Sequence, residues 1–174
     1  IDVAYRYFLT NKRKYIIADT PGHEQYTRNM ITGASTSDLA IILVNAKLGL
    51  LEQTKRHAIL CSILGIKHIV LAINKIDLIN YDEKKIKKID FNFKEFSKNL
   101  EFETIEVIPI SALHGDNITK RSEKTLWFNG NTLMDFLENV EIYKNKNDVF
   151  RFNVQLAVRT NDNFRGYSGQ VISG

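Results

Sequence analysis

The sequence predicts an α/β fold, with a doubly wound and mostly parallel sheet, followed by the start of a β-barrel domain. Two continuous apolar runs, at residues 39–44 and 68–73, are typical of strands covered on both faces in a parallel sheet. Strand and helix patterns alternate along this part of the chain. From residue 149 the pattern changes to short alternation, which indicates a separate β domain.

Each element follows from its local pattern. A polar turn at residues 10–13 joins two strand-like runs into a hairpin. Gly65 follows the helical segment between the two apolar runs and is a good helix cap. The predicted strands are residues 2–9, 14–18, 39–44, 68–73, 104–110 and 150–156, with a glycine-rich turn at 165–167; the predicted helices are residues 24–35, 53–64, 81–100 and 132–140.

The composition is that of an ordinary soluble globular protein. The chain has 174 residues, of which 44% are hydrophobic, and its net charge of +4 is spread along the sequence. The densest basic run, residues 83–88, fits the solvated face of a helix better than a nucleic-acid site. The single cysteine, Cys61, lies in an apolar segment, which predicts a core thiol in a reducing compartment. Without a membrane-length apolar stretch or a signal peptide, we expect a cytoplasmic protein with neither nucleic-acid nor membrane partners.

Three short stretches fall where predicted strands end, which is where ligands bind in open α/β sheets. The first is Asp19-Thr20-Pro21-Gly22, followed by His23. The Asp19 carboxylate can hold Mg²⁺ through water, and Gly22 lacks a Cβ, so its N–H can approach a terminal phosphate. The alternative for this stretch is a plain turn.

The second stretch, Asn74-Lys75-Ile76-Asp77, follows the strand predicted at 68–73. Asp77 can accept two hydrogen bonds, from N1–H and from the N2 amino group of guanine. Asn74 can bond the other edge of the base, and the stem of Lys75 can cover the ring face. The alternative is a capped turn.

The third stretch, Ser111-Ala112-Leu113, follows the last predicted strand of the sheet, and a backbone N–H there can donate to guanine O6. Adenine would leave the Asp77 carboxylate unpaired and set its own amino donor against the N–H of Ala112. Because unpaired buried polar groups are costly, such a site would refuse adenine.

In order and placement the three stretches resemble the P-loop GTPase family. The resemblance implies a site for GTP and Mg²⁺, with a phosphate-sensing switch at Asp19 and a guanine reader at Asn74. His23 stands where small signalling GTPases have glutamine, and residues 21–35, PGHEQYTRNMITGAS, resemble the translational GTPases. In that branch His23 would orient the attacking water; the alternative is a solvent-facing turn histidine.

The resemblance carries these roles to particular positions of this chain. His23 is the expected catalytic residue, and Asp19 is the expected metal ligand. Glu24, Tyr26 and Arg28 could be no more than the faces of the switch helix. The residues expected to contact the nucleotide are Asp19, Thr20, Pro21, Gly22, His23, Asn74, Lys75, Asp77, Ser111, Ala112 and Leu113.

Two groups within the translational branch compete. Elongation factor Tu and its archaeal and eukaryotic counterparts share the Gly-His switch, the stretch at 29–34 and a following barrel. The GTPase subunits of sulfate adenylyltransferase resemble the chain over nearly all of its length. Asn131 and Asn153 stand where that family has proline, which changes local backbone stiffness only. The segments that favour this second group are residues 2–8, 12–19, 127–133 and 150–155, together with 163–169.

The second resemblance implies a two-subunit enzyme that makes adenosine 5′-phosphosulfate and pyrophosphate from ATP and sulfate. A small subunit would transfer the adenylyl group, and this GTPase subunit would hydrolyse GTP to GDP to drive the unfavourable equilibrium. The expected domains are a truncated GTP-binding domain at 1–145 and the beginning of a translation-factor-type barrel at 149–174. A non-catalytic scaffold is the alternative from a different functional class.

The chain contains no Gly-Lys pair, and therefore no G-x-x-x-x-G-K-[ST] phosphate-binding loop. Since the chain also begins with isoleucine, we expect a truncated GTPase subunit that binds GTP weakly by itself and is inactive alone. The strand expected between residues 14–18 and 39–44 is missing. We expect another copy to fill this gap by self-association, the flanking strands to pair directly, or the hairpin to pair elsewhere.

Overall fold

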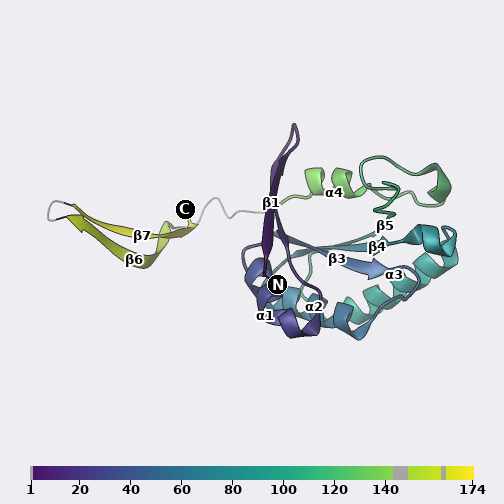
Figure 1. The fold of residues 1–174 in the computed structure, drawn as a ribbon, viewed down its shortest axis with the longest axis horizontal. Coiled ribbons are helices and arrows are strands. Elements are labelled where there is room, and N and C mark those ends of the chain that lie inside the picture. The colour runs from purple at the N-terminus through teal and green to yellow at the C-terminus, as the bar shows by residue number, and fades with distance from the viewer. Residues whose placement is uncertain (1, 143–148, 162–163) are drawn as a thin grey trace. The chain divides into compact units, whose positions relative to one another are not determined.

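The fold is given by a computed structural model, which describes residues 2–142, 149–161 and 164–174 (Figure 1). The chain divides into two compact units, Ile1–Val140 and Glu141–Gly174. The first unit contains β1 (Ala4–Leu9), β2 (Lys14–Asp19), the 3₁₀ helix η1 (Glu24–Tyr26), α1 (Thr27–Ala34), β3 (Leu39–Asn45), α2 (Glu52–Ile63), β4 (His68–Asn74), η2 (Ile76–Ile79), α3 (Glu83–Ser97), β5 (Thr104–Pro109), η3 (Glu123–Thr125) and α4 (Leu133–Asn139). The second unit contains β6 (Arg151–Asn161) and β7 (Phe164–Ser173).

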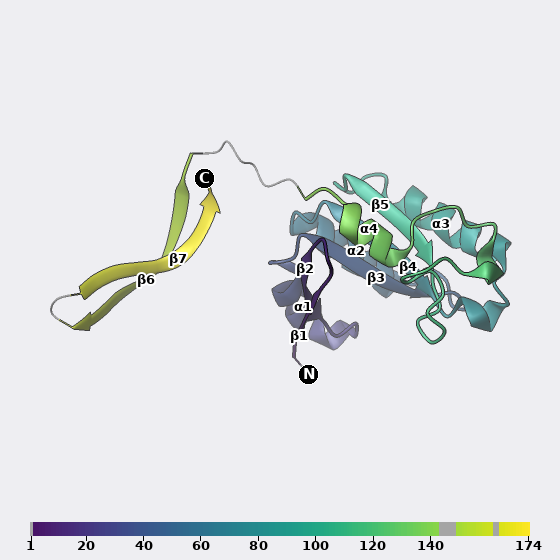
Figure 2. The same cartoon turned by 90° about the horizontal axis from the view of Figure 1, so that it is seen from above.

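The first unit is built on a parallel sheet with strand order β3-β4-β5. Figures 1 and 2 show α1, α2 and α3 on one face of this sheet and α4 on the other. The predicted doubly wound α/β fold is therefore confirmed. β4 lies in the centre, and residues 68–73 are all buried, as expected for a strand covered on both faces.

The apolar face of α3 explains why this helix docks on the sheet. Ile86, Ile89 and Phe93 recur at helical spacing and are all buried in the core. Burying each such side chain contributes about 1.5–3 kcal/mol. The Asp82 carboxylate caps the helix by accepting the N–H of Lys84 at 2.9 Å.

Helix α3 begins two residues later than the sequence predicted. Asn80 and Tyr81 have positive φ values of 52° and 56°, so the chain leaves η2 through left-handed backbone before α3 can start. These residues therefore form a turn and not the first turn of the helix.

Strand β3 is not covered on both faces, contrary to what the sequence predicts. Ile41 and Leu43 are 42% and 63% exposed, whereas Ile42 and Val44, on the opposite face, are buried. The expected burial on both faces is right for β4 and wrong for β3. The reason is that only the face of β3 that carries Ile42 and Val44 packs into the core.

Strands β1 and β2 form a separate antiparallel hairpin. In the residues that the structure describes, β2 pairs only with β1 and β3 only with β4, so the expectation that the flanking strands pair directly is wrong. The hairpin also joins no other sheet of the described chain. Its tip is fixed to α4 instead, because the Arg13 guanidinium donates to the carbonyls of Leu137 and Val140. Exchange of a strand between copies stays a prediction.

The second unit is an antiparallel hairpin of β6 and β7, and its described residues form no closed barrel. The turn predicted at 165–167 is wrong, because Gly166 pairs with Val158 inside the ladder. Residues 162–163, which separate β6 from β7 in the sequence, lie outside the described residues, as does the Asn163 position used in the family resemblance. The expected domain boundary at 145–149 falls largely on the undescribed residues 143–148, so the two domain assignments stay predictions.

The predicted core thiol is confirmed, since Cys61 on α2 is 1% exposed. Burial raises the pKa of the Cys61 thiol to about 11. The folded protein therefore holds the proton more tightly than the unfolded chain, and this contribution to stability is lost as the pH rises from about 9 towards 11.

We expect iodoacetamide to modify native Cys61 at pH 8 many times more slowly than the urea-unfolded chain, because only the thiolate reacts and the thiol is enclosed. Mass spectrometry of the alkylated protein measures both rates. Equal rates in the two states would contradict the burial of this residue.

Among the described helices, none is long and apolar enough to cross a membrane.

Candidate functional site

The loop after β4 is joined to the loop after β5 through one side chain. Asn74, the last residue of β4, accepts the N–H of Ala112 at 3.0 Å and that of Lys75 at 2.7 Å on the same oxygen, Oδ1. Lys75 has a positive φ of 63°, which turns the chain sharply out of the strand. The amide oxygen of Asn74 thus holds the two predicted base-reading stretches together.

A second contact joins the same two loops. The Ser111 hydroxyl, which is buried, donates to Asp77 Oδ1 at 2.7 Å. This hydrogen bond lowers the pKa of Asp77, and the charges of His114 and Lys124 lower it further. Asp77 therefore stays ionised at neutral pH and acts only as an acceptor.

Three other members of these stretches face solvent, whereas Ile76 is buried in the core. Lys75, Ala112 and Leu113 are exposed, and Leu113 is 83% exposed. The arrangement presents a fixed carboxylate, a backbone loop and a lysine stem beside one another at the surface. This set of groups can receive a flat ligand edge that carries two donors.

The predicted phosphate-side stretch follows β2. Asp19 ends the strand, and its side chain is exposed. Thr20 packs closely on α1: a Cβ added to Gly33 would lie 2.5 Å from Thr20 Cγ2. The small residue in the helix lets the start of the switch lie against it, and a larger side chain there would displace it. Pro21 is partly buried and Gly22 is exposed.

His23 caps the short helix η1 and is exposed. Its Nδ1 accepts from the N–H of Gln25 at 3.5 Å, and its ring lies edge-on to Tyr26 with centroids 6.2 Å apart. Its ring therefore faces solvent in this conformation of the chain.

The predicted switch contacts two residues of α2, Arg56 and His57, that the sequence did not single out. Glu24 forms an ion pair with Arg56, and Gly22 lies beside the ring of His57. His57 shares a contact of 2.9 Å with Gln53 on the preceding helical turn, and burial lowers the pKa of His57. The spacing of Gln53 and His57 places them on one face of a helix, and this is visible in the sequence. Nothing in the spacing indicates that this face contacts the predicted switch.

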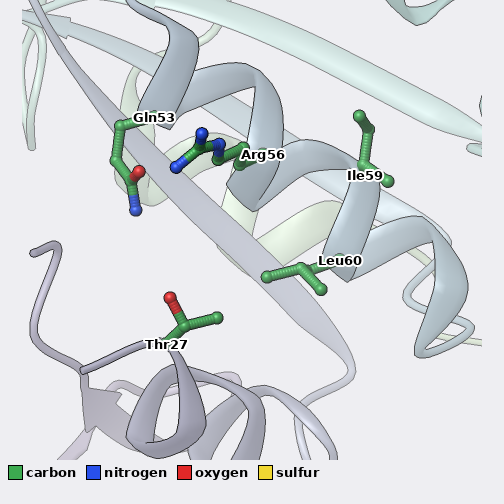
Figure 3. Close-up of a pocket in the computed structure, with 5 residues that line it drawn as sticks. All are labelled: Thr27, Gln53, Arg56, Ile59 and Leu60. Atoms are coloured by element: carbon green, nitrogen blue, oxygen red, sulfur yellow. The ribbon is translucent and has the colours of Figure 1, made fainter. Parts of the chain in front are cut away.

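Figure 3 shows a pocket next to the predicted switch, where Thr27 at the start of α1 faces one side of α2. Its volume is about 220 Å³. It is lined by Thr27, Gln53, Arg56, Ile59 and Leu60. None of these is a predicted site residue, so the pocket is separate from the base-reading loops.

Within the described residues, no group of three or more His, Cys, Asp or Glu side chains could hold a metal ion by itself. The single exposed carboxylate of Asp19 suits a hard cation that keeps most of its waters, as Mg²⁺ does. Its chemistry therefore fits the predicted water-mediated contact, with further ligands coming from elsewhere.

The structure brings together four of the predicted residues: Asn74, Asp77, Ser111 and Ala112. The contacts of the phosphate-side stretch are with α1 and α2 instead.

Comparison with known proteins identifies relatives along the whole chain. It is 59% identical over 175 residues to sulfate adenylyltransferase subunit 1 of Alteromonas mediterranea, covering all of this chain and 37% of that protein. It is 55% identical to the bifunctional enzyme NodQ of a Rhizobium species, covering all of this chain and 27% of that protein. The chain thus spans 37% and 27% of the lengths of these two curated relatives.

A solved structure gives the same fold. Translation elongation factor SelB of Methanococcus maripaludis, in complex with the GTP analogue GppNHp, matches with a TM-score of 0.67 and 26% identity. The match covers all of this chain and 36% of that one. Residues 1–143 also match the family model described as the elongation factor Tu GTP binding domain. Over residues 1–143, this chain therefore belongs to the elongation factor Tu GTP binding domain family.

Proposed function

We propose that the chain binds GTP, and that Asn74, Asp77 and Ala112 select the guanine base. The observation that carries this proposal is the hydrogen bond between Ser111 and Asp77, which fixes an ionised carboxylate at the surface. Guanine offers two neighbouring donors to such a carboxylate, whereas adenine offers none in that position. The stem of Lys75 and the exposed Leu113 would flank the base.

On the phosphate side, we propose that residues 19–23 form the switch of a GTPase. The Asp19 carboxylate would hold Mg²⁺ through water, and the ion would neutralise charge that develops on the phosphates. Gly22 would offer its N–H to the γ-phosphate, with Thr20 and Pro21 shaping the turn. His23 would orient the attacking water once the switch turns it towards the nucleotide.

The chain contains no Gly-Lys pair, so it lacks the phosphate-binding loop whose lysine and backbone N–H groups neutralise the β- and γ-phosphates. We therefore expect only weak GTP binding by the 174 residues alone. Nucleotide experiments are best made on the full-length gene product.

We propose that the full-length gene product is the GTPase subunit of a sulfate adenylyltransferase. The identity of 59% to subunit 1 of such an enzyme, along all of this chain, supports the proposal. A small subunit would form adenosine 5′-phosphosulfate from ATP and sulfate, and the two would act as a cytoplasmic heterodimer. GTP would drive the reaction only to the extent that the GTP-bound and GDP-bound forms of this subunit differ in their free energy of interaction with the small subunit.

The test mixes the full-length gene product with the small adenylyltransferase subunit and measures phosphate release from GTP. We expect GTP turnover to rise several-fold on addition of ATP and sulfate together, because coupling requires both substrates. ATP alone and sulfate alone are the matched controls. Turnover that responds to ribosomes and aminoacyl-tRNA instead would identify a translation factor, and no turnover in either assay would leave a scaffold.

A further inference from the structure

Asn117 belongs to no motif of the sequence, yet its side chain is hydrogen-bonded through both Nδ2 and Oδ1 close to the base-reading loops. It is 1% exposed and lies in the segment between β5 and η3. Its Nδ2 donates to the carbonyl of Pro109 at 2.8 Å and to Thr125 Oγ1 at 2.9 Å. Its Oδ1 accepts the N–H of Ser122 at 2.8 Å. One carboxamide therefore ties the end of β5 to two later points of the chain.

The backbone of Asn117 is bonded as well. Its N–H donates to the carbonyl of Lys120 at 3.1 Å, and its carbonyl accepts the N–H of Leu133 at the start of α4 at 3.0 Å. Its φ of 57° lies in the left-handed region, where asparagine is tolerated far better than most residues. This residue thus closes the loop and attaches it to a helix.

The loop that Asn117 closes is the one that carries Ser111 and Ala112. The Ser111 N–H donates to the Asp116 carbonyl at 3.3 Å, and the Gly115 N–H donates to the Ser111 carbonyl at 2.8 Å. The loop leaves β5 at Pro109 and returns at Asn117, and the Asn117 carboxamide spans both ends. A shift of Asn117 would therefore move Ala112.

Asp116 extends the same network to the Asp77 loop. Its two carboxylate oxygens accept the hydroxyls of Ser122, at 2.7 Å, and of Tyr81, at 3.0 Å. Tyr81 follows η2, the short helix that contains Asp77. The two base-reading loops are thus connected behind the surface as well as at it.

We propose that Asn117 is a positioning residue for guanine selection: its buried hydrogen bonds fix where the Ala112 N–H and the Ser111–Asp77 pair stand. The inference rests on the proposed GTP-binding function. It adds to that function a residue, Asn117, that need not contact the nucleotide. Asn117 determines how strongly the site prefers guanine over adenine. A loosened loop can turn the Ala112 N–H away from the adenine amino group, which removes the clash between two donors.

The test uses Asn117→Gly, which removes the side chain without strain at a positive φ. A second variant, Thr125→Val, keeps the side-chain volume and removes one hydroxyl partner of Asn117. Thr54→Val is the matched control, since Thr54 is a buried threonine on α2. Each variant of the full-length gene product is measured for the preference for GTP over ATP in competition titrations, for amide exchange at Ala112, and for its unfolding midpoint.

We expect Asn117→Gly to reduce the preference for GTP about tenfold, to speed exchange at Ala112, and to leave the rest of the fold intact. Thr125→Val is expected to act in the same direction with a smaller effect, and Thr54→Val is expected to leave the preference unchanged. Unchanged preference and exchange in both loop variants would overturn the inference alone. An equal loss of preference in Thr54→Val would also overturn it. Wild-type protein without any preference for GTP would overturn the proposed function, and the inference with it.

Discussion

Replacing Asp77 by asparagine is expected to weaken GTP binding about a hundredfold in the full-length gene product and to shift its preference towards xanthosine triphosphate. The Asp77 carboxylate is ionised and anchored by Ser111, so it offers two acceptors to the two donors of guanine. An asparagine at this position offers one acceptor and one donor. Xanthine carries a carbonyl where guanine carries its amino group, and therefore matches the amide.

Competition titrations with GTP, xanthosine triphosphate and ATP measure this exchange of preference. Asp38→Asn is a matched control, because Asp38 is an exposed aspartate between α1 and β3, outside the predicted site. It is expected to change none of the three affinities. If Asp77→Asn left the nucleotide preference as it was, Asp77 could not be the residue that reads guanine.

The second large effect is expected at His23, where alanine should lower GTP turnover about 100- to 1000-fold while GTP affinity changes little. The water that His23 would orient is needed for the chemical step and not for binding. In the present conformation His23 is exposed and caps η1 through Nδ1, so a large turnover defect would also mean that the switch rearranges during the reaction.

Single-turnover hydrolysis and equilibrium binding of GTP separate the two quantities. His23→Gln is the informative companion, because glutamine occupies this place in small signalling GTPases and should retain part of the rate. If alanine reduced affinity and turnover by the same factor, His23 would be a structural cap and not a catalytic residue.

Local patterns in the sequence were sufficient for the central strand and for the order of the elements. The run Ile69–Ile73 is apolar without interruption, and only a strand with neighbours on both faces of a sheet can bury such a run. The base-reading stretches were predicted for a similar reason, since each directly follows a strand whose end is visible in the sequence. These are short-range properties, and the residues concerned are adjacent in the chain.

Local backbone conformation and long-range contacts decided the rest. The start of α3 depended on two consecutive left-handed residues, Asn80 and Tyr81, which no periodicity reveals. The exposure of Ile41 and Leu43 depended on which face of β3 packs into the core. The orientation of the β1–β2 hairpin depended on the bonds of Arg13 to α4.

The site divides in the same way. The sequence by itself predicted which groups would read guanine, because Asn74 and Asp77 carry side-chain donors and acceptors, and Ala112 a backbone N–H, directly after predictable strands. Only the tertiary structure decided that Ser111 bonds Asp77, that His57 lies beside Gly22, and that Asn117 closes the loop behind them. The physical reason is that a hydrogen bond between residues 34 apart, as Ser111 and Asp77 are, forms only after β4 and β5 have paired and set the distance between their ends.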